Sequence, residues 1–212
     1  MTSSRVFLLS PANCNGARAR IITSPRAGFA LATQLRGDTG APLGDVFSFV
    51  SGLYFRSKLA YARRFSRPPD ADCEVAGNGV LVITPNAGLR SPETAITIDS
   101  LRAFADVPID LENHEYREAL TRGAAALNAA MGPDCEAVLL GSIASGKDVD
   151  VLLPIFGDRL VFPAEFVGRG DMSRGGLMLR CVLAERELEY LPVSRAVRRG
   201  RRPPKLVPLR KH

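Results

Sequence analysis

The chain has 212 residues, enough for one domain with a substantial buried core, and its 46% hydrophobic and 24% charged residues are ordinary for a globular protein. No apolar run is long enough to span a bilayer, and Val6–Leu9 is too short for a secretory signal, so we expect a cytoplasmic protein that does not bind membranes. The four cysteines lack the close spacing of a metal or redox motif, and we expect neither a metal nor a cofactor.

The formal charge of +6 is concentrated at the C-terminus. The residues from 195 onward carry eight cations and no acid, so the other 194 residues hold 20 cations against 22 acids, a formal charge of −2. We therefore expect a single domain over 1–194 and a basic, proline-containing tail over 195–212. Such a tail binds nucleic acid through counterion release, or it is a solvated extension; composition favours neither. The tail cations are Arg195, Arg198, Arg199, Arg201, Arg202, Lys205, Arg210 and Lys211.

Apolar patterning predicts strands that alternate with helices. Continuous apolar runs predict buried strands at 6–9, 79–84, 136–140 and 160–162. Helical spacing of apolar residues predicts helices at 29–35, 53–65, 112–131, 149–156 and 177–183. This alternation predicts a three-layer α/β fold with a mostly parallel sheet and helices on both faces. In such sheets ligands bind at the carboxyl ends of the strands, where the polar, glycine-rich turns of this chain fall.

One of these turns has the G-x4-G-K spacing of a phosphate-binding loop. Small residues allow backbone N–H groups to surround an anion, and a lysine adds positive charge. However, Asp148 stands where the metal-binding Ser or Thr would be, and only 65 residues follow Lys147, so we expect an anion-binding turn and not an NTPase. The alternative is a tight strand-to-helix turn without a ligand. The predicted anion-binding residues are Gly141, Ser142, Ser145, Gly146 and Lys147.

The segment GRGDMSRGG (168–176) is predicted to be a functional loop that opens the last helix. Four glycines in nine residues indicate an unusual backbone path or a close ligand. Arg169 and Arg174 are expected to bind a phosphate or carboxylate with Gly170 and Ser173, and Asp171 to orient water, accept a proton or bind a ribose hydroxyl. The alternative is an Arg–Asp ion pair that fixes the loop.

A third group of candidates lies in the first half of the chain. Arg56 and Lys58, near a helix start, could reach a phosphate, and Tyr54 could stack on a base. Asn86, in the turn 84–89, is a further candidate for binding the ligand. The alternative, which we weigh slightly higher, is that the aromatic and cationic side chains lie over the core with their polar ends in water.

Five short motifs follow one another along the chain: Leu8–Ser10, Gly52 with the helix containing Ala60-Tyr61-Ala62, Val80–Leu89, Glu136–Gly141 and Gly168–Gly176. In this order they resemble proteins related to the peroxide-stress protein YaaA and to the uracil-DNA-glycosylase-like domain attached to archaeal tRNA-guanine transglycosylases. Ala87 stands where that group tends to have histidine. The resemblance implies a connection to nucleic acids or nucleobases.

Three classes of function remain. The first is a glycosylase- or transferase-like enzyme acting on a nucleobase, nucleotide or N-glycosidic bond, with Asp171 and Lys147 as catalytic residues. The second is a non-catalytic DNA- or RNA-binding protein that uses the same cations. The third is a module whose tail docks on an acidic protein surface. We rank them in this order, with the first two close.

Overall fold

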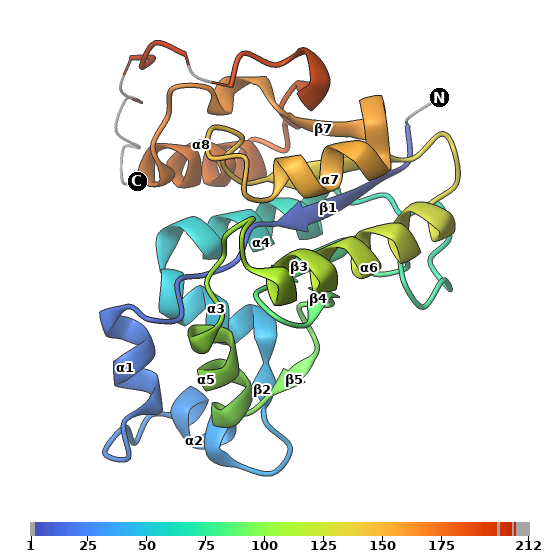
Figure 1. Ribbon diagram of the computed structural model, residues 1–212. Helices are drawn as coiled ribbons and strands as arrows, with labels where there is room; N and C mark the ends of the chain where they lie inside the picture. The colour runs from blue at the N-terminus through green and yellow to red at the C-terminus, as the bar shows by residue number, and fades with distance from the viewer. Residues whose placement is uncertain (1–2, 199, 205, 207–212) are drawn as a thin grey trace.

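The computed structural model describes residues 3–198, 200–204 and 206. Six strands of this part form one sheet in the order β4-β3-β1-β6-β7-β8 (Figure 1). The four inner strands are parallel, and the two edge strands pair antiparallel to their neighbours. The strands are β1 (Arg5–Leu9), β3 (Val80–Thr84), β4 (Gly88–Arg90), β6 (Glu136–Leu140), β7 (Leu160–Pro163) and β8 (Tyr190–Pro192).

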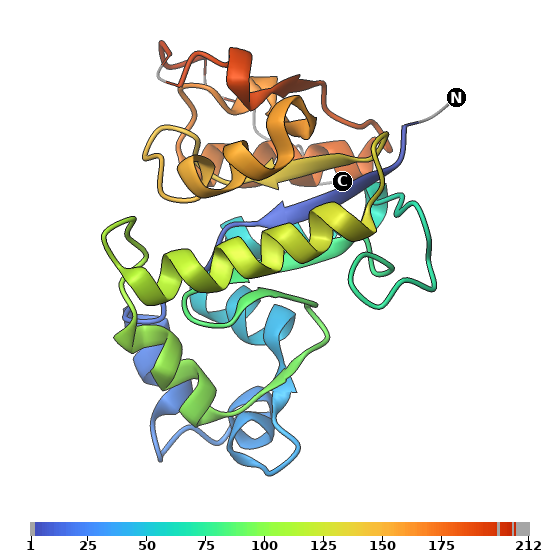
Figure 2. The same cartoon turned by 45° about the vertical axis from the view of Figure 1, so that its right-hand side comes forward.

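Helices cover both faces of the sheet (Figures 1 and 2). The side chains of β1 alternate between two cores: Phe7 and Leu9 pack with α4 and α8, whereas Val6 and Leu8 pack with α6 and α7. The predicted three-layer α/β fold is therefore confirmed. The main helices are α1 (Ala17–Thr23), α2 (Ala30–Arg36), α3 (Leu43–Ser51), α4 (Leu53–Phe65), α5 (Ile98–Asp106), α6 (His114–Ala130), α7 (Val149–Phe156) and α8 (Asp171–Leu183), with 3-10 turns at Gly157–Arg159, Ala164–Phe166 and Val193–Arg195. No helix in the described part of the chain is long and apolar enough to cross a membrane.

Four helices extend the α4 side of the molecule away from the sheet. The helices α1, α2, α3 and α5 gather around a short antiparallel pair, β2 (Ala41–Pro42) and β5 (Ala95–Ile96), in the lower part of Figure 1. The sequence patterns assigned no helix to α3, and they identified only a short apolar segment at α5. Side-chain capping of α5 by Thr97, and burial of Val46, Phe47 and Phe104 against one core, explain why both segments are helical.

The last helix begins at Asp171, earlier than the predicted start at 177, so the last six of the nine residues of the predicted loop 168–176 are helical. The glycines of this segment explain the difference. A Cβ on Gly175 would lie 3.0 Å from Ser57 Oγ and 3.5 Å from Tyr54 Cα, both on α4. Glycine here allows α8 to pack closely on α4, and this contact outweighs the low helix propensity of glycine.

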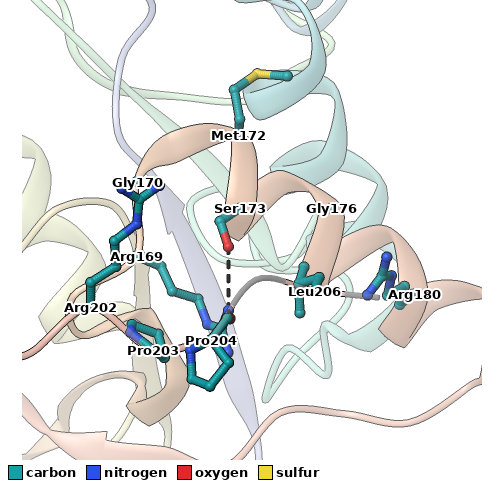
Figure 3. A pocket seen from close by; sticks show the side chains of 10 residues that line it. All are labelled: Arg169, Gly170, Met172, Ser173, Gly176, Arg180, Arg202, Pro203, Pro204 and Leu206. Atoms are coloured by element: carbon teal, nitrogen blue, oxygen red, sulfur yellow. Dashed lines mark hydrogen bonds between the residues drawn. The ribbon is translucent and has the colours of Figure 1, made fainter. Parts of the chain in front are cut away.

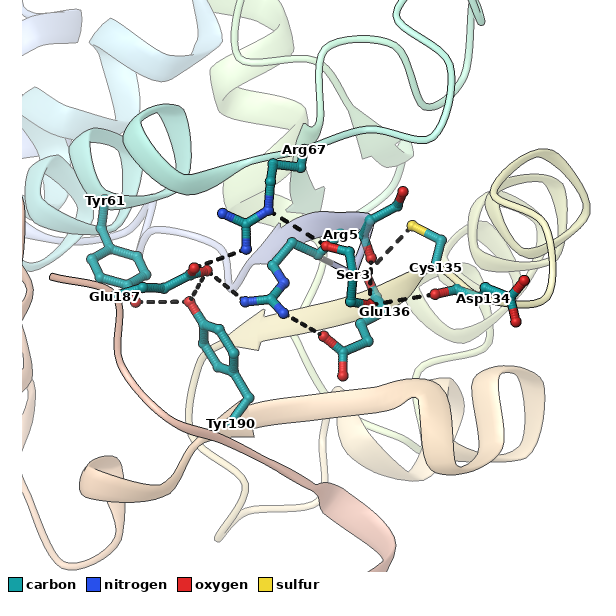
Figure 4. A network of polar contacts seen from close by, with 10 residues as sticks. Ser3, Arg5, Tyr61, Arg67, Asp134, Cys135, Glu136, Glu187 and Tyr190 are labelled. Atoms are coloured by element: carbon teal, nitrogen blue, oxygen red, sulfur yellow. Dashed lines mark hydrogen bonds and ion pairs between the residues drawn. The ribbon is translucent and has the colours of Figure 1, made fainter. Parts of the chain in front are cut away.

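A polar network ties the amino ends of the strands together (Figure 4). Arg5 Nη1 donates to Glu187 Oε1 at 2.7 Å, and Arg5 Nη2 lies 3.0 Å from Glu136 Oε2. Arg67 Nη2 donates to Glu187 Oε2 at 2.8 Å, and the Tyr190 hydroxyl donates to Glu187 Oε1 at 3.0 Å. Burial opposes the ionisation of Glu187, but the hydrogen bonds from Arg67 and Arg5 outweigh it and hold the pKa of this carboxyl below its usual value.

Where it is described, the basic tail lies against the domain. Arg198 forms an ion pair with Asp150 at 2.9 Å, and Arg169 Nη1 donates to the carbonyl of Pro204 at 3.4 Å. Gly168 has φ +71°, and a Cβ there would lie 2.3 Å from the carbonyl oxygen of Arg201. Four of the eight tail cations lie outside the described residues: Arg199, Lys205, Arg210 and Lys211.

Candidate functional site

The connections that follow β1 and β6 leave the sheet on opposite faces. After β1 the chain passes to α4 on one face, and after β6 it passes to α7 on the other. Because β1 and β6 are neighbours and parallel, their carboxyl ends are the point at which open α/β sheets bind ligands. A cavity of about 250 Å³ lies there, and we call it the switch-point cavity. It is lined by Ser10, Pro11, Asn13, Ser51, Tyr54, Ile109, Ser142, Ser145, Lys147, Asp148 and Asp171.

The switch-point cavity brings together five of the residues predicted from the sequence. They come from α4, from the turn between β6 and α7, and from the start of α8: Tyr54, Ser142, Ser145, Lys147 and Asp171. Two further predicted residues, Lys58 and Arg174, are buried beside it. The carboxyl ends of the strands thus collect most of the charged candidates at one place.

Lys58 is buried beneath the switch-point cavity, with 1% of its surface exposed. Its Nζ donates to the carbonyl oxygen of Ser10 at 2.6 Å and lies 2.9 Å from Ser10 Oγ. The same ammonium nitrogen lies 4.6 Å from the ring centre of Tyr54 and 5.0 Å from that of Phe55. Burial lowers the pKa of Lys58 to about 7, although Asp148 opposes this effect. Lys58 is therefore a buried amine: its charge neither reaches out to a phosphate nor lies in water, the two alternatives that the sequence suggested.

Asp148 is a buried carboxyl group at the wall of the cavity, with 6% of its surface exposed. The hydroxyl of Tyr116, on α6, donates to Asp148 Oδ1 at 2.5 Å. Burial raises the pKa of Asp148, while the Tyr116 hydrogen bond and the charges of Lys58 and Lys147 act in the opposite direction. Desolvation therefore favours a carboxyl group that keeps its proton to a higher pH than usual.

Asp171 and Arg174 occupy the first turn of α8. The side chain of Asp171 is 67% exposed, and its Oδ1 lies 3.8 Å from Arg174 Nη1. Arg174 is almost fully buried and donates from Nε and Nη2 to the carbonyl of Phe166, at 3.3 and 3.2 Å. Arg174 thus holds the preceding loop and the start of α8, and it leaves Asp171 open to solvent at the cavity.

The hydroxyl of Tyr54 is buried without a hydrogen-bond partner among the described residues. Burial raises the pKa of Tyr54 to about 12, and the nearby Arg174 guanidinium opposes this effect without forming a hydrogen bond of good geometry. A buried phenol without a partner costs free energy of folding unless a ligand or water supplies one. Tyr54 thus lines the cavity, while its hydroxyl lies below the surface near the Arg174 guanidinium.

Acidic groups surround the predicted anion-binding turn. Gly146 has φ +72°, and a Cβ there would lie 2.5 Å from Asp150 Oδ2, so the turn requires glycine. Asp148 immediately precedes α7, and Asp150 lies in its first turn, so two carboxyl groups stand at the positive end of the helix. Lys147 is the exposed cation of this turn. Anion binding here stays a prediction.

A second cavity, of about 360 Å³, lies between the start of α8 and the C-terminal segment, and we call it the arginine cavity (Figure 3). Besides its bond to Pro204, Arg169 donates to the carbonyl of Glu165 at 2.9 Å and to Ser173 Oγ at 3.3 Å. The cavity is lined by Arg169, Gly170, Met172, Ser173, Gly176, Arg180, Arg202, Pro203, Pro204 and Leu206. Three predicted ligand-binding residues thus lie outside the switch-point cavity.

The remaining candidates lie elsewhere. Gly141 lines a third cavity, of about 230 Å³, with Arg169 and Arg174. Asn86 lines a separate cavity near β5 and α5, and Arg56 is exposed on α4. Neither Asn86 nor Arg56 contributes to the switch-point cavity.

Several residues in or beside the site were not predicted as site residues from the sequence, among them Ser10, Asn13, Asp148 and Tyr116. Ser10 and Asn13 follow a strand in an ordinary polar loop, and Asp148 was noted only as a departure from the phosphate-loop pattern. Tyr116 carried the apolar periodicity of a helix and gave no sign of a functional hydroxyl. The one available signal was position, because Ser10, Asn13 and Asp148 all follow buried parallel strands.

No protein-family model, no curated protein and no solved structure matches the chain.

Proposed function

We propose that this protein is an enzyme that acts on a nucleobase, nucleoside or nucleotide and breaks or exchanges an N-glycosidic bond in the switch-point cavity. The observation that carries the proposal is the pair of aspartates on the cavity wall, Asp148 and Asp171. One is buried and the other is exposed, so the two carboxyl groups have contrasting environments.

The contrast between the two aspartates suits the chemistry of this bond. The departing base needs a proton, and the sugar carbon needs a nucleophile together with stabilisation of its developing positive charge. Burial raises the pKa of Asp148, which supports a role as the proton donor. Asp171, open to solvent, is placed to orient a water molecule and to stabilise the sugar.

The polarity of the cavity supports a nucleobase as the group bound inside it. Carboxyl groups favour a ligand that presents N–H donors, and the edges of nucleobases carry such donors. Lys147, exposed at the same cavity, is placed to meet a phosphate outside it. The resemblance noted in the sequence and the basic tail support the same class of substrate.

The test is release of free base from nucleosides, nucleotides and short DNA and RNA, followed by chromatography. We expect turnover with at least one of these substrates, and we expect Asp171→Asn to lower it by about 10²- to 10⁴-fold while substrate binding is kept. Asp99→Asn is the matched control, since Asp99 is exposed on α5, away from the cavity. Equal turnover in the Asp171→Asn protein, or no base release from any substrate, would contradict the proposal.

A second candidate function is binding of DNA or RNA without catalysis. The observation that favours it is the arginine cavity, which Arg169 and Arg180 of the domain line together with Arg202 of the tail. A nucleic-acid binder should lose affinity steeply with salt, and a protein ending at Ser194 should show a flatter dependence. An affinity for DNA and RNA that does not change with salt concentration would contradict this candidate function.

A further inference from the structure

Ser10 and Lys58 form a hydrogen-bonded pair at the floor of the switch-point cavity. Ser10 directly follows β1 and lines the cavity, and its Oγ lies 2.9 Å from Lys58 Nζ. Lys58 is enclosed beneath it by the rings of Tyr54 and Phe55. The residue that carries the hydroxyl therefore borders the cavity, whereas the amine is shut off from solvent.

The surroundings of Lys58 allow its amine to act as a base near neutral pH. Burial lowers the pKa of Lys58 to about 7, the charges of Asp148 and Asp171 oppose this, and that of Arg174 adds to it. A neutral amine has two N–H donors and one lone pair. In the structure Lys58 Nζ donates to the carbonyl oxygen of Ser10 at 2.6 Å and to Ser10 Oγ at 2.9 Å, and Ser10 Oγ donates to the carbonyl oxygen of Leu140 at 3.3 Å. When Lys58 is neutral, its lone pair can accept the Ser10 Oγ proton in place of the Leu140 carbonyl, while an N–H of the amine still donates to the Ser10 carbonyl.

We propose that Ser10 is a nucleophile in acyl transfer, with Lys58 as its general base, and that its substrate is an uncharged carboxylic ester or amide. Serine–lysine pairs perform this chemistry on unrelated folds. The carboxyl groups of Asp148 and Asp171 on the same wall disfavour an anionic electrophile such as a phosphate ester, so an uncharged carbonyl is the better fit. This activity goes beyond the proposed N-glycosidic chemistry and does not depend on it.

The reaction has two balanced steps. Lys58 takes the proton of Ser10 Oγ, the oxygen attacks the carbonyl carbon, and the leaving alcohol or amine departs with the proton held by Lys58. Water then attacks the acyl-serine ester with Lys58 again as the base, which releases the carboxylic acid and restores the hydroxyl of Ser10.

Asn13 is placed to assist this reaction. It lines the same cavity, and its Oδ1 accepts a hydrogen bond from the backbone N–H of Asn15 at 3.0 Å. Its Nδ2 makes no hydrogen bond with any residue that the structure describes. A side-chain amide donor beside the nucleophile is the kind of group that stabilises the oxyanion of a tetrahedral intermediate.

The experiment is labelling of the full chain with a fluorophosphonate, which reacts with activated serine hydroxyls, followed by mass measurement and peptide mapping. We expect one label per chain, on Ser10, and a labelling rate that rises with pH to half of its maximum at about pH 7. Absence of label on Ser10, or a rate that shows no inflection up to about pH 9, would overturn the proposal.

Variants separate a catalytic role of Lys58 from a structural one. Lys58→Met should lower the labelling rate by about 10²-fold or more, Ser10→Ala should abolish it, and the control Ser48→Ala, on α3, should leave it unchanged. Labelling of a folded Lys58→Met protein at the wild-type rate would refute the role of Lys58. If Lys58→Met does not fold, the pH profile of the wild-type protein still decides. If Ser10 is not labelled, the proposed release of free base is unaffected. If no base is released, the proposed acyl transfer is unaffected, so each proposal is tested by its own experiment.

Discussion

The hydrogen bond between Tyr116 and Asp148 offers the sharpest test of the site. Tyr116 is fully buried, and its hydroxyl donates to Asp148 Oδ1 at 2.5 Å. The substitution Tyr116→Phe removes one oxygen atom and keeps the ring that packs in the core. It therefore deprives the buried carboxyl of its donor with little change in packing.

The expected cost follows from the charge on the acceptor. A hydrogen bond to an ionised group contributes about 1.5–3 kcal/mol, against about 0.5–1.5 kcal/mol for a neutral pair. We expect Tyr116→Phe to lower the free energy of unfolding by about 2 kcal/mol where Asp148 is ionised. For a chain of this length that corresponds to a fall in Tm of about 4–8 °C.

The cost should also depend on pH. Burial already raises the pKa of Asp148, so its folded pKa lies above the unfolded value of about 3.9, and the native state loses stability as pH rises through the folded pKa. Removing the Tyr116 hydroxyl raises that folded pKa further. The variant should therefore lose more stability than the wild type as pH increases, and the cost should be larger at about pH 8 than at about pH 5.

The assay is urea denaturation at several pH values, with Asp148→Asn used to complete a double-mutant cycle. In the Asp148→Asn background, Tyr116→Phe should cost only what a neutral hydrogen bond contributes. Tyr61→Phe is the matched control, because its hydroxyl bonds Tyr190 and the Leu188 amide and no carboxylate. A pH-independent cost of less than about 0.5 kcal/mol, equal in both backgrounds, would refute the reasoning.

Three further outcomes are expected. Gly88→Ala should destabilise the fold by at least about 2 kcal/mol in urea denaturation, because Gly88 has φ +68° and a Cβ would lie 2.4 Å from the carbonyl oxygen of Ala119. Glu187→Gln should lower the free energy of unfolding at neutral pH, because a neutral amide cannot form the ion pairs with Arg5 and Arg67. Folding lowers the pKa of Glu187, so its contribution to the free energy of unfolding is fully present above the unfolded pKa of about 4.3 and is lost as pH falls through the folded pKa. The free energies of unfolding of wild type and variant, measured by urea denaturation at decreasing pH, should therefore become equal at acid pH. The free energy of unfolding of the wild type should increase as pH rises from about 7 to about 10, because over this range the unfolded chain keeps the Lys58 proton and the folded chain does not. In Lys58→Met this increase should be absent.

The sheet and its layers could be predicted from the sequence because they depend on local patterns. Continuous apolar runs marked β1, β3, β6 and β7, and apolar periodicity marked α4, α6 and α7. The start of α8 could not be predicted in this way. Gly175 is a poor helix former by itself, and only the approach of α4 shows why a glycine is needed there.

The sequence also determined where the candidate residues would gather, since polar turns after parallel strands meet at one edge of the sheet. Tyr54, Lys147 and Asp171 were among the candidates because of their residue types and their positions in or near these turns. The sequence could not show that the candidates line two different cavities. Arg169 lines the arginine cavity and Asp171 lines the switch-point cavity, because their side chains lie on different sides of the first turn of α8.

The chemistry of the site was decided by the tertiary structure alone. Ser10 and Lys58 are 48 positions apart, and Tyr116 and Asp148 are 32 positions apart, so no local pattern joins either pair. Burial then sets the protonation of these groups: desolvation lowers the pKa of Lys58 and raises that of Asp148. Sequence determines which groups are present, but only packing removes water from them, and the removal of water is what changes their affinity for a proton.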